Sequence, residues 1–265
     1  MNEASKKAIL VVSFGTSYEN TRKLTIDAIE HYIAKAFPAC PTYRAWTSKM
    51  IISKLKKRDG ITIHTVEEAM EQMLMDGITD VIVQPTHVIN GIENDQMKAD
   101  ALSFRDRFSS IVFGNPLLTT DEDNQAVVQA VADEFQDLDP ETALVLMGHG
   151  TEHYANSVYA ALDYRFKDTG YKNIFLGTVE AYPALDSLLR AAGSFHPKKI
   201  VLAPFMIVAG DHAQNDLAGE DPDSWMSRLS SEGYEVTPVL KGLGEYPKIR
   251  QILVDHVQHV IDAAV

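Results

Sequence analysis

Cysteine is almost absent: Cys40 is the single one among 265 residues. One cysteine cannot close an internal disulfide, and it cannot supply the paired thiolates of a Cys-x-x-Cys zinc or redox site. The sequence therefore gives no reason to expect an oxidising compartment or a metal site built from thiolates.

Basic residues and long apolar runs are also scarce. There are 24 Lys and Arg against 37 Asp and Glu, a formal net charge of -13 at pH 7. Capture of nucleic acid or of an anionic membrane requires a basic face, so we expect neither as a partner. No run approaches the roughly 20 apolar residues of a membrane span, and the stretch 8–13 is too short for a secretion signal. We expect a cytoplasmic protein, and the sequence leaves a homo-oligomer open.

Short apolar runs alternate with amphipathic segments along the chain, in which 45% of the residues are hydrophobic. The run 8–13 ends at a glycine, and we expect a helix after it, capped by Ser17 and ending at Pro38. The same alternation predicts further strands at 81–83, 111–113, 143–147 and 174–178, and helices near 65–76, 95–108 and 121–136. Continuous apolar strands that alternate with amphipathic helices are typical of a parallel α/β sheet.

The order of these motifs starts again near Glu141. The strand 143–147 ends in Gly-His-Gly-Thr as the first strand ends in Ser-Phe-Gly-Thr, and the segments 80–91 and 199–210 share one spacing from proline to glycine. Two motifs that recur in the same order suggest an internal duplication. We therefore predict an α/β fold of two similar lobes, each a parallel sheet flanked by helices, in which residues 1–138 form the N-terminal lobe and 139–265 the C-terminal lobe with the metal site. The first half is longer, and the basic helix Lys49 to Arg58 is its expected insertion.

Three chemistry-bearing side chains follow strands of the second half. His149 follows the strand 143–147, Glu180 follows 174–178, and His212 follows a strand that we expect to end near Val208. Ligands of open α/β sheets bind beyond the carboxyl ends of the strands, so the three share one edge. Two imidazoles and one carboxylate suit a borderline divalent metal with open positions. Taken singly, each residue has an ordinary alternative: a hydrogen-bonded structural histidine, or a solvated or capping carboxylate.

Two other histidines stay open as functional residues. His87 follows a strand of the first half, which makes it a candidate for substrate binding. His153 stands four residues after His149, but Gly150 and Thr151 between them argue against one helix that carries both. We interpret the remaining histidines as surface residues: His31, His64, His196, His256 and His259.

At these residues the sequence resembles the class II tetrapyrrole chelatases, and among them the long anaerobic cobaltochelatases that act on sirohydrochlorin in cobalamin synthesis. The resemblance spans nearly the whole chain and is carried by the segments 11–18, 147–150, 179–183, 208–216 and 242–245. It implies two α/β lobes related by duplication, with the metal bound by His149, Glu180 and His212. We assign His149 a catalytic role as well, as proton acceptor, because a neutral imidazole is both a ligand and a base.

The family's small members carry a histidine at the end of the first strand, where this chain has Phe14. The resemblance therefore implies that the first lobe holds the macrocycle without holding the metal.

The resemblance also implies a divalent metal ion as substrate, with Co²⁺ expected and Fe²⁺ or Ni²⁺ as alternatives that the same ligands suit. Sirohydrochlorin carries eight carboxylates, which a chain of net charge -13 repels at long range. We expect local donors to offset this repulsion, from Ser13, Thr16 and Ser17 at a helix start. Two other functions stay open: a carrier that binds a tetrapyrrole or metal without turnover, and a metal-dependent hydrolase.

Overall fold

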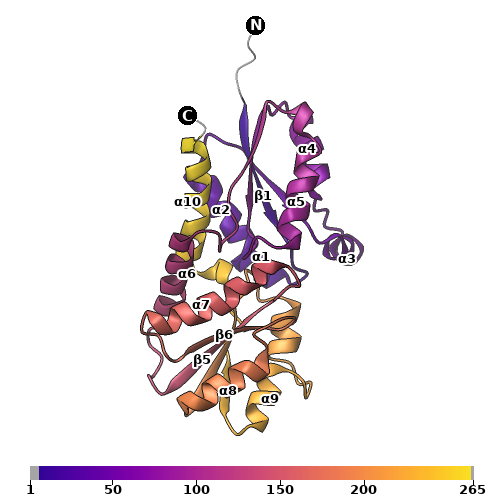
Figure 1. The fold of residues 1–265 in the computed structure, drawn as a ribbon. Helices are drawn as coiled ribbons and strands as arrows, with labels where there is room; N and C mark the ends of the chain where they lie inside the picture. The colour runs from indigo at the N-terminus through magenta and orange to yellow at the C-terminus, as the bar shows by residue number, and fades with distance from the viewer. Residues whose placement is uncertain (1–5, 264–265) are drawn as a thin grey trace. The chain divides into compact units, whose positions relative to one another are not determined.

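The computed structural model describes residues 6–263, which form two compact units (Figure 1). The first unit contains the chain up to Thr119 together with the C-terminal stretch from Ile249, and the second is Thr120–Lys248. Each unit is built around its own four-stranded parallel sheet. None of the helices in this part of the chain has the length and the apolar character needed to cross a membrane.

The first unit has the strand order β2-β1-β3-β4. β1 lies inside the sheet, and every residue after Lys7 in it is buried, which explains its unbroken apolar run. The elements are β1 (Lys7–Ser13), α1 (Glu19–Leu24), α2 (Ile26–Ala36), β2 (Thr42–Trp46), α3 (Lys49–Asp59), α4 (Val66–Met75), β3 (Asp80–Pro85), α5 (Ile92–Leu102), the short turn η1 (Arg105–Arg107) and β4 (Ser110–Phe113).

The second unit repeats this topology with the order β6-β5-β7-β8. The matching strand orders agree with the duplication that the sequence predicts. Its elements are α6 (Asp121–Glu134), β5 (Thr142–Gly148), η2 (Tyr154–Asn156), α7 (Ser157–Asp168), β6 (Ile174–Thr178), α8 (Leu185–Phe195), β7 (Lys199–Pro204), the π-helical turn η3 (Ala213–Leu217), α9 (Trp225–Ser231), β8 (Glu235–Pro238) and η4 (Leu243–Glu245).

The compact units differ from the expected halves 1–138 and 139–265. α6 follows the first sheet in sequence but belongs to the second unit, where Asp121 pairs with Arg165 of α7. The last helix, α10 (Pro247–Ala263), follows the second sheet but belongs to the first unit, where Arg250 lies over the Tyr32 ring. The helix after the fourth strand of each half therefore belongs to the unit built on the other half's sheet. The predicted boundary rested on the polar, proline-terminated segment 137–140, which composition alone identifies.

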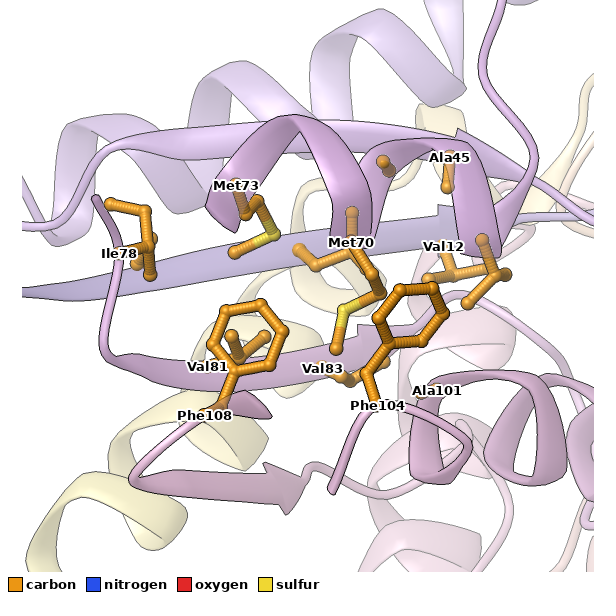
Figure 2. Packing of buried hydrophobic residues seen from close by; sticks show 14 of the residues in the cluster. Val12, Ala45, Met70, Met73, Ile78, Val81, Val83, Ala101, Phe104 and Phe108 are labelled. Carbon is orange, nitrogen blue, oxygen red and sulfur yellow. The ribbon is translucent and has the colours of Figure 1, made fainter. Parts of the chain in front are cut away.

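The core of the first unit shows why α4 forms where the sequence predicts it. Thr65 and Glu68 make a reciprocal capping box at the start of the helix. Apolar residues at three- and four-residue steps then place Met70 and Met73 on one face. Figure 2 shows both methionines over Val81 and Val83 of β3, beside Phe104 and Phe108. This packing fixes α4 on the sheet.

Three sequence predictions in the first unit are wrong in detail. Ser17 does not cap the first helix: Tyr18 is the residue before α1, and the Ser17 carbonyl accepts a hydrogen bond from Arg58. The helix also breaks at Thr25, whose N–H and hydroxyl both donate to the Thr21 carbonyl. His256 is not a surface residue, because it is 4% exposed and its Nδ1 lies 2.9 Å from the Asn115 carbonyl oxygen.

Candidate metal site

The three predicted ligands lie together at the carboxyl edge of the second sheet. β5 is the neighbour of both β6 and β7 in a parallel sheet, so the segments that leave these strands start side by side. His149, Glu180 and His212 each offer one ligand atom, and these atoms all lie within 4.8 Å of one another. β7 ends at Pro204 rather than near Val208, and His212 lies just before the π-helical turn η3.

The backbone holds His149 and Glu180 next to each other. The pairing of β5 with β6 continues past the strand ends, where the Val179 N–H donates to the Gly148 carbonyl at 3.0 Å and the Glu180 N–H to the His149 carbonyl at 2.9 Å. Gly150 follows with a φ of +88°, and a Cβ there would lie 2.9 Å from Thr178 Cβ. The glycine therefore meets both a conformational and a steric requirement.

Hydrogen bonds at Nδ1 set the orientation of both imidazoles. His149 Nδ1 lies 2.7 Å from the Gly150 carbonyl oxygen, which can only accept, so this nitrogen carries the proton. His212 Nδ1 lies 2.8 Å from Asp216 Oδ2. In both rings the lone pair is then on Nε2. A carboxylate or carbonyl partner behind a ligating histidine fixes its tautomer and its ring orientation.

The triad offers two imidazoles and one carboxylate, a donor set that suits a divalent ion. Glu180 faces both imidazoles, with Oε2 at 3.6 Å from His149 Nδ1 and Oε1 at 4.0 Å from His212 Nε2. The two rings are perpendicular, with centroids 4.6 Å apart. The side chains are between 34% and 52% exposed, so ligand positions on the solvent side stay open. Open positions are the mark of sites where a bound metal reacts rather than only stabilises.

The corresponding positions of the first unit lack such a ligand set. The Ser48 N–H donates to the Phe14 carbonyl as that of Glu180 does to His149, so Phe14 and Ser48 are the structural counterparts of His149 and Glu180. Phe14 is 45% exposed and offers no metal ligand. Among residues 6–263, the triad of the second unit is the one cluster with metal-binding spacing.

Two of the hydroxyl residues predicted to bind substrate are buried. Ser13 is 1% exposed and its Oγ accepts from the Thr86 hydroxyl at 2.9 Å. Thr16 is 3% exposed and its Oγ1 accepts from the Tyr18 N–H. Both hydroxyls therefore support the loop after β1. Ser17 is partly exposed in the same loop. A role in substrate binding stays a prediction for all three.

His87 lies in the first unit, on the segment after β3, and so outside the triad. Both ring nitrogens are buried without a hydrogen-bond partner, and the Asn94 side chain is the polar neighbour. Burial lowers the pKa of His87 from 6.5 to about 4. The ring is therefore neutral at pH 7 and can accept or donate a single hydrogen bond at each nitrogen.

We expect mild acid to destabilise the protein through His87. Between its folded pKa of about 4 and its usual 6.5, the unfolded chain binds a proton that the folded chain does not, so stability falls as pH falls. From pH 7 to pH 5 this contribution is about 2 kcal/mol of unfolding free energy. Urea unfolding of the wild type and His87→Gln at both pH values measures it. When the pH falls from 7 to 5, the unfolding free energy of His87→Gln should fall by about 2 kcal/mol less than that of the wild type. Equal decreases in both proteins would contradict the role of His87.

Asp216, the partner of His212 Nδ1, is a polar neighbour of the triad that the sequence did not identify. Asp216 reads as an ordinary residue of a helix start, and the signal that could have identified it is its spacing of four residues from His212. His153 does not join the ligands: its Nδ1 accepts from the Ala155 N–H, and its ring lies 4.0 Å from that of Tyr154. The interruption by Gly150 and Thr151 is confirmed, because no helix spans His149 and His153.

Comparison with known proteins points in one direction. Residues 7–262 match the model of the family described as cobalt chelatase (CbiK). The sirohydrochlorin cobaltochelatase of Salmonella typhimurium is 40% identical over 98% of both chains. The sirohydrochlorin cobaltochelatase CbiKC of Nitratidesulfovibrio vulgaris is 32% identical over 98% of this chain and 92% of its own.

Solved structures share the fold at low sequence identity. The sirohydrochlorin chelatase SirB from Bacillus subtilis subspecies spizizenii, solved in complex with cobalt, has a TM-score of 0.64 and 14% identity, covering 97% of this chain and 96% of its own. CbiX, described as the terminal enzyme of sirohaem biosynthesis in denitrifying bacteria, has a TM-score of 0.54 and 15% identity, covering 97% and 99%. Both confirm an α/β chelatase fold.

Proposed function

Because the chain belongs to the cobalt chelatase (CbiK) family, we propose that it is a lyase-class metal chelatase that inserts Co²⁺ into sirohydrochlorin and releases two protons. The observation that carries the proposal is the convergence of two imidazoles and a carboxylate within 4.8 Å in a chain 40% identical to a sirohydrochlorin cobaltochelatase. The reaction is a step of anaerobic cobalamin biosynthesis.

In the proposed mechanism His149 Nε2, a Glu180 oxygen and His212 Nε2 hold the ion before it is transferred. The Glu180 carboxylate offsets one of the two positive charges, while the neutral imidazoles replace water ligands without adding charge. A site with three ligands and open positions holds the ion less firmly than a closed cage. The ion can then pass to the four ring nitrogens of the macrocycle.

Metal insertion also requires a proton acceptor. Two pyrrole N–H groups of the macrocycle lose their protons as the metal–nitrogen bonds form, so one divalent ion enters and two protons leave. We assign the first acceptance to His149, because its Nε2 lone pair becomes free when the ion departs. Its Nδ1–H stays bonded to the Gly150 carbonyl, which keeps the ring aimed at the same point.

Cobalt as the ion follows from the relatives rather than from the ligand set. Two histidines and a glutamate also suit Fe²⁺ and Ni²⁺. Substrate contacts through Ser13, Thr16, Ser17 and His87, a cytoplasmic location and a homo-oligomeric state likewise stay predictions.

An anaerobic absorbance assay with sirohydrochlorin tests the proposal and ranks the metals. We expect the purified protein to accelerate the spectral change that accompanies insertion of Co²⁺ above the protein-free rate, and to do so less efficiently with Fe²⁺ and Ni²⁺. Binding of the macrocycle with no acceleration for any of the three ions would contradict the enzyme and favour a carrier. Faster insertion of iron or nickel would overturn the choice of metal alone.

A further inference from the structure

Helix α3 has no counterpart in the second half of the chain. Between β2 and β3 the chain forms two helices, α3 and α4, whereas between β6 and β7 it forms α8 alone. The segment Lys49–Asp59 is thus an addition to one copy of an otherwise shared plan, and it corresponds to the insertion that the sequence predicts. A function of this helix is specific to the first unit.

Positive charge gathers on this helix. Its sequence, KMIISKLKKRD, carries five basic residues and one acidic residue in a chain of net charge -13. Lys54, Lys56 and Lys57 are exposed, and they make no ion pair within the described residues. Lysines elsewhere are commonly neutralised, as Lys199 is by Glu235 and Lys241 by Glu134. The helix therefore presents cations that no neighbouring carboxylate cancels.

Both ends of α3 are attached to the loop that leaves β1 at the carboxyl edge of the first sheet. At its start the Ser48 N–H donates to the Phe14 carbonyl at 3.2 Å, and at its end the Arg58 guanidinium donates to the Ser17 carbonyl at 2.7 Å. Leu55 is the buried residue of the helix. Figure 1 shows α3 standing apart from α4 and α5, which cover the sheet. Ser48 is the counterpart of Glu180, so the helix starts where the second unit has a metal ligand.

We propose that α3 is a capture surface for the carboxylates of the tetrapyrrole substrate, an inference that rests on the proposed function. A polyanionic macrocycle approaching this protein meets net repulsion, and a local group of cations at a ligand-binding edge raises its concentration there. Met50, 76% exposed in the first turn, adds an apolar contact beside the cations. An amphiphilic ring with an acidic rim matches this combination.

The test replaces the three cations without an ion-pair partner and leaves the metal ligands unchanged. Lys54→Gln, Lys56→Gln and Lys57→Gln are combined in the full chain, since glutamine keeps a helix propensity close to that of lysine. The matched control makes the same change of charge at three lysines for which no ion pair is seen among the described residues, all at the opposite edge of the sheets: Lys7, which begins β1, and the exposed Lys35 and Lys172, which precede β2 and β6.

We expect the α3 variant to lose about tenfold in kcat/KM for sirohydrochlorin at low salt, the lower end of electrostatic steering effects. The loss should lie in KM, with kcat and Co²⁺ affinity unchanged. Because salt screens exposed charges, the higher kcat/KM of the wild type should fall to that of the variant as salt is raised from about 20 mM to 300 mM. The kcat/KM of the variant should depend less on salt. The control should match the wild type.

Equal kcat/KM and equal salt dependence in the wild type and the α3 variant would overturn the proposal, as would an equal loss in the control. A direct titration of sirohydrochlorin binding, followed by absorbance without metal, separates this result from failure of the proposed function. A wild type that binds the macrocycle more tightly than the α3 variant but inserts no cobalt would refute the enzyme and retain the capture surface.

Discussion

Replacing His149 with alanine is expected to lower kcat for cobalt insertion by about 10³-fold, within the range for loss of a general base. The change removes one metal ligand and the proposed proton acceptor together. The ring lies beside Glu180 and perpendicular to His212, so no neighbouring imidazole can take its place in the same geometry. Anaerobic absorbance kinetics with saturating Co²⁺ and sirohydrochlorin measure the effect.

His153→Ala is the matched control for this experiment. It removes a histidine four residues away that contacts Tyr154 and the Ala155 N–H rather than the triad. The control should keep kcat within about twofold, since it leaves every proposed ligand in place. A kcat near that of the wild type in His149→Ala would refute the catalytic assignment. Retained sirohydrochlorin binding in that variant would show that its loss of activity is not a loss of fold.

Replacing Asp216 with asparagine is expected to weaken Co²⁺ binding by about 10- to 100-fold, the usual effect of losing a carboxylate behind a metal-binding histidine. Asp216 Oδ2 lies 2.8 Å from His212 Nδ1 and holds the N–H, which leaves Nε2 directed toward Glu180. Asparagine keeps the size of the side chain but removes the charge. An anaerobic titration that follows cobalt absorbance gives the dissociation constant.

Asp223→Asn removes the same charge from an exposed position of the second unit and should leave Co²⁺ affinity unchanged. Equal affinities in Asp216→Asn and the wild type would contradict the positioning role. Asp216→Glu should recover part of the Co²⁺ affinity that Asp216→Asn loses, because it restores the carboxylate. If Asp216 only supported the local fold, restoring the charge would not restore the affinity. Asp216→Asn therefore measures the loss of the carboxylate charge, and Asp216→Glu tests whether a carboxylate at this position is sufficient. Asp223→Asn shows the effect of the change in net charge alone.

Much of the fold and the convergence of His149, Glu180 and His212 could be predicted from the sequence because the signals are local. A continuous apolar run such as 143–147 identifies a strand buried on both faces, and the residue just after a parallel strand lies at the ligand-binding edge. That rule placed His149 and Glu180 at one edge without any knowledge of their separation in space. The motifs that recur in both halves similarly predicted two sheets of the same topology, because a duplicated sequence has the same periodicity in each copy.

Only the tertiary structure decided what depends on contacts between distant segments. α6 and α10 belong to the units built on the other half's sheet, an arrangement that depends on contacts between distant segments and that periodicity does not encode. Ser13 and Thr16 are polar in sequence yet buried, because Thr86 and the Tyr18 N–H supply their hydrogen bonds. The proposal that Nε2 is the ligand atom of His149 and His212 follows from their partners at Nδ1, and only the folded chain places those partners there.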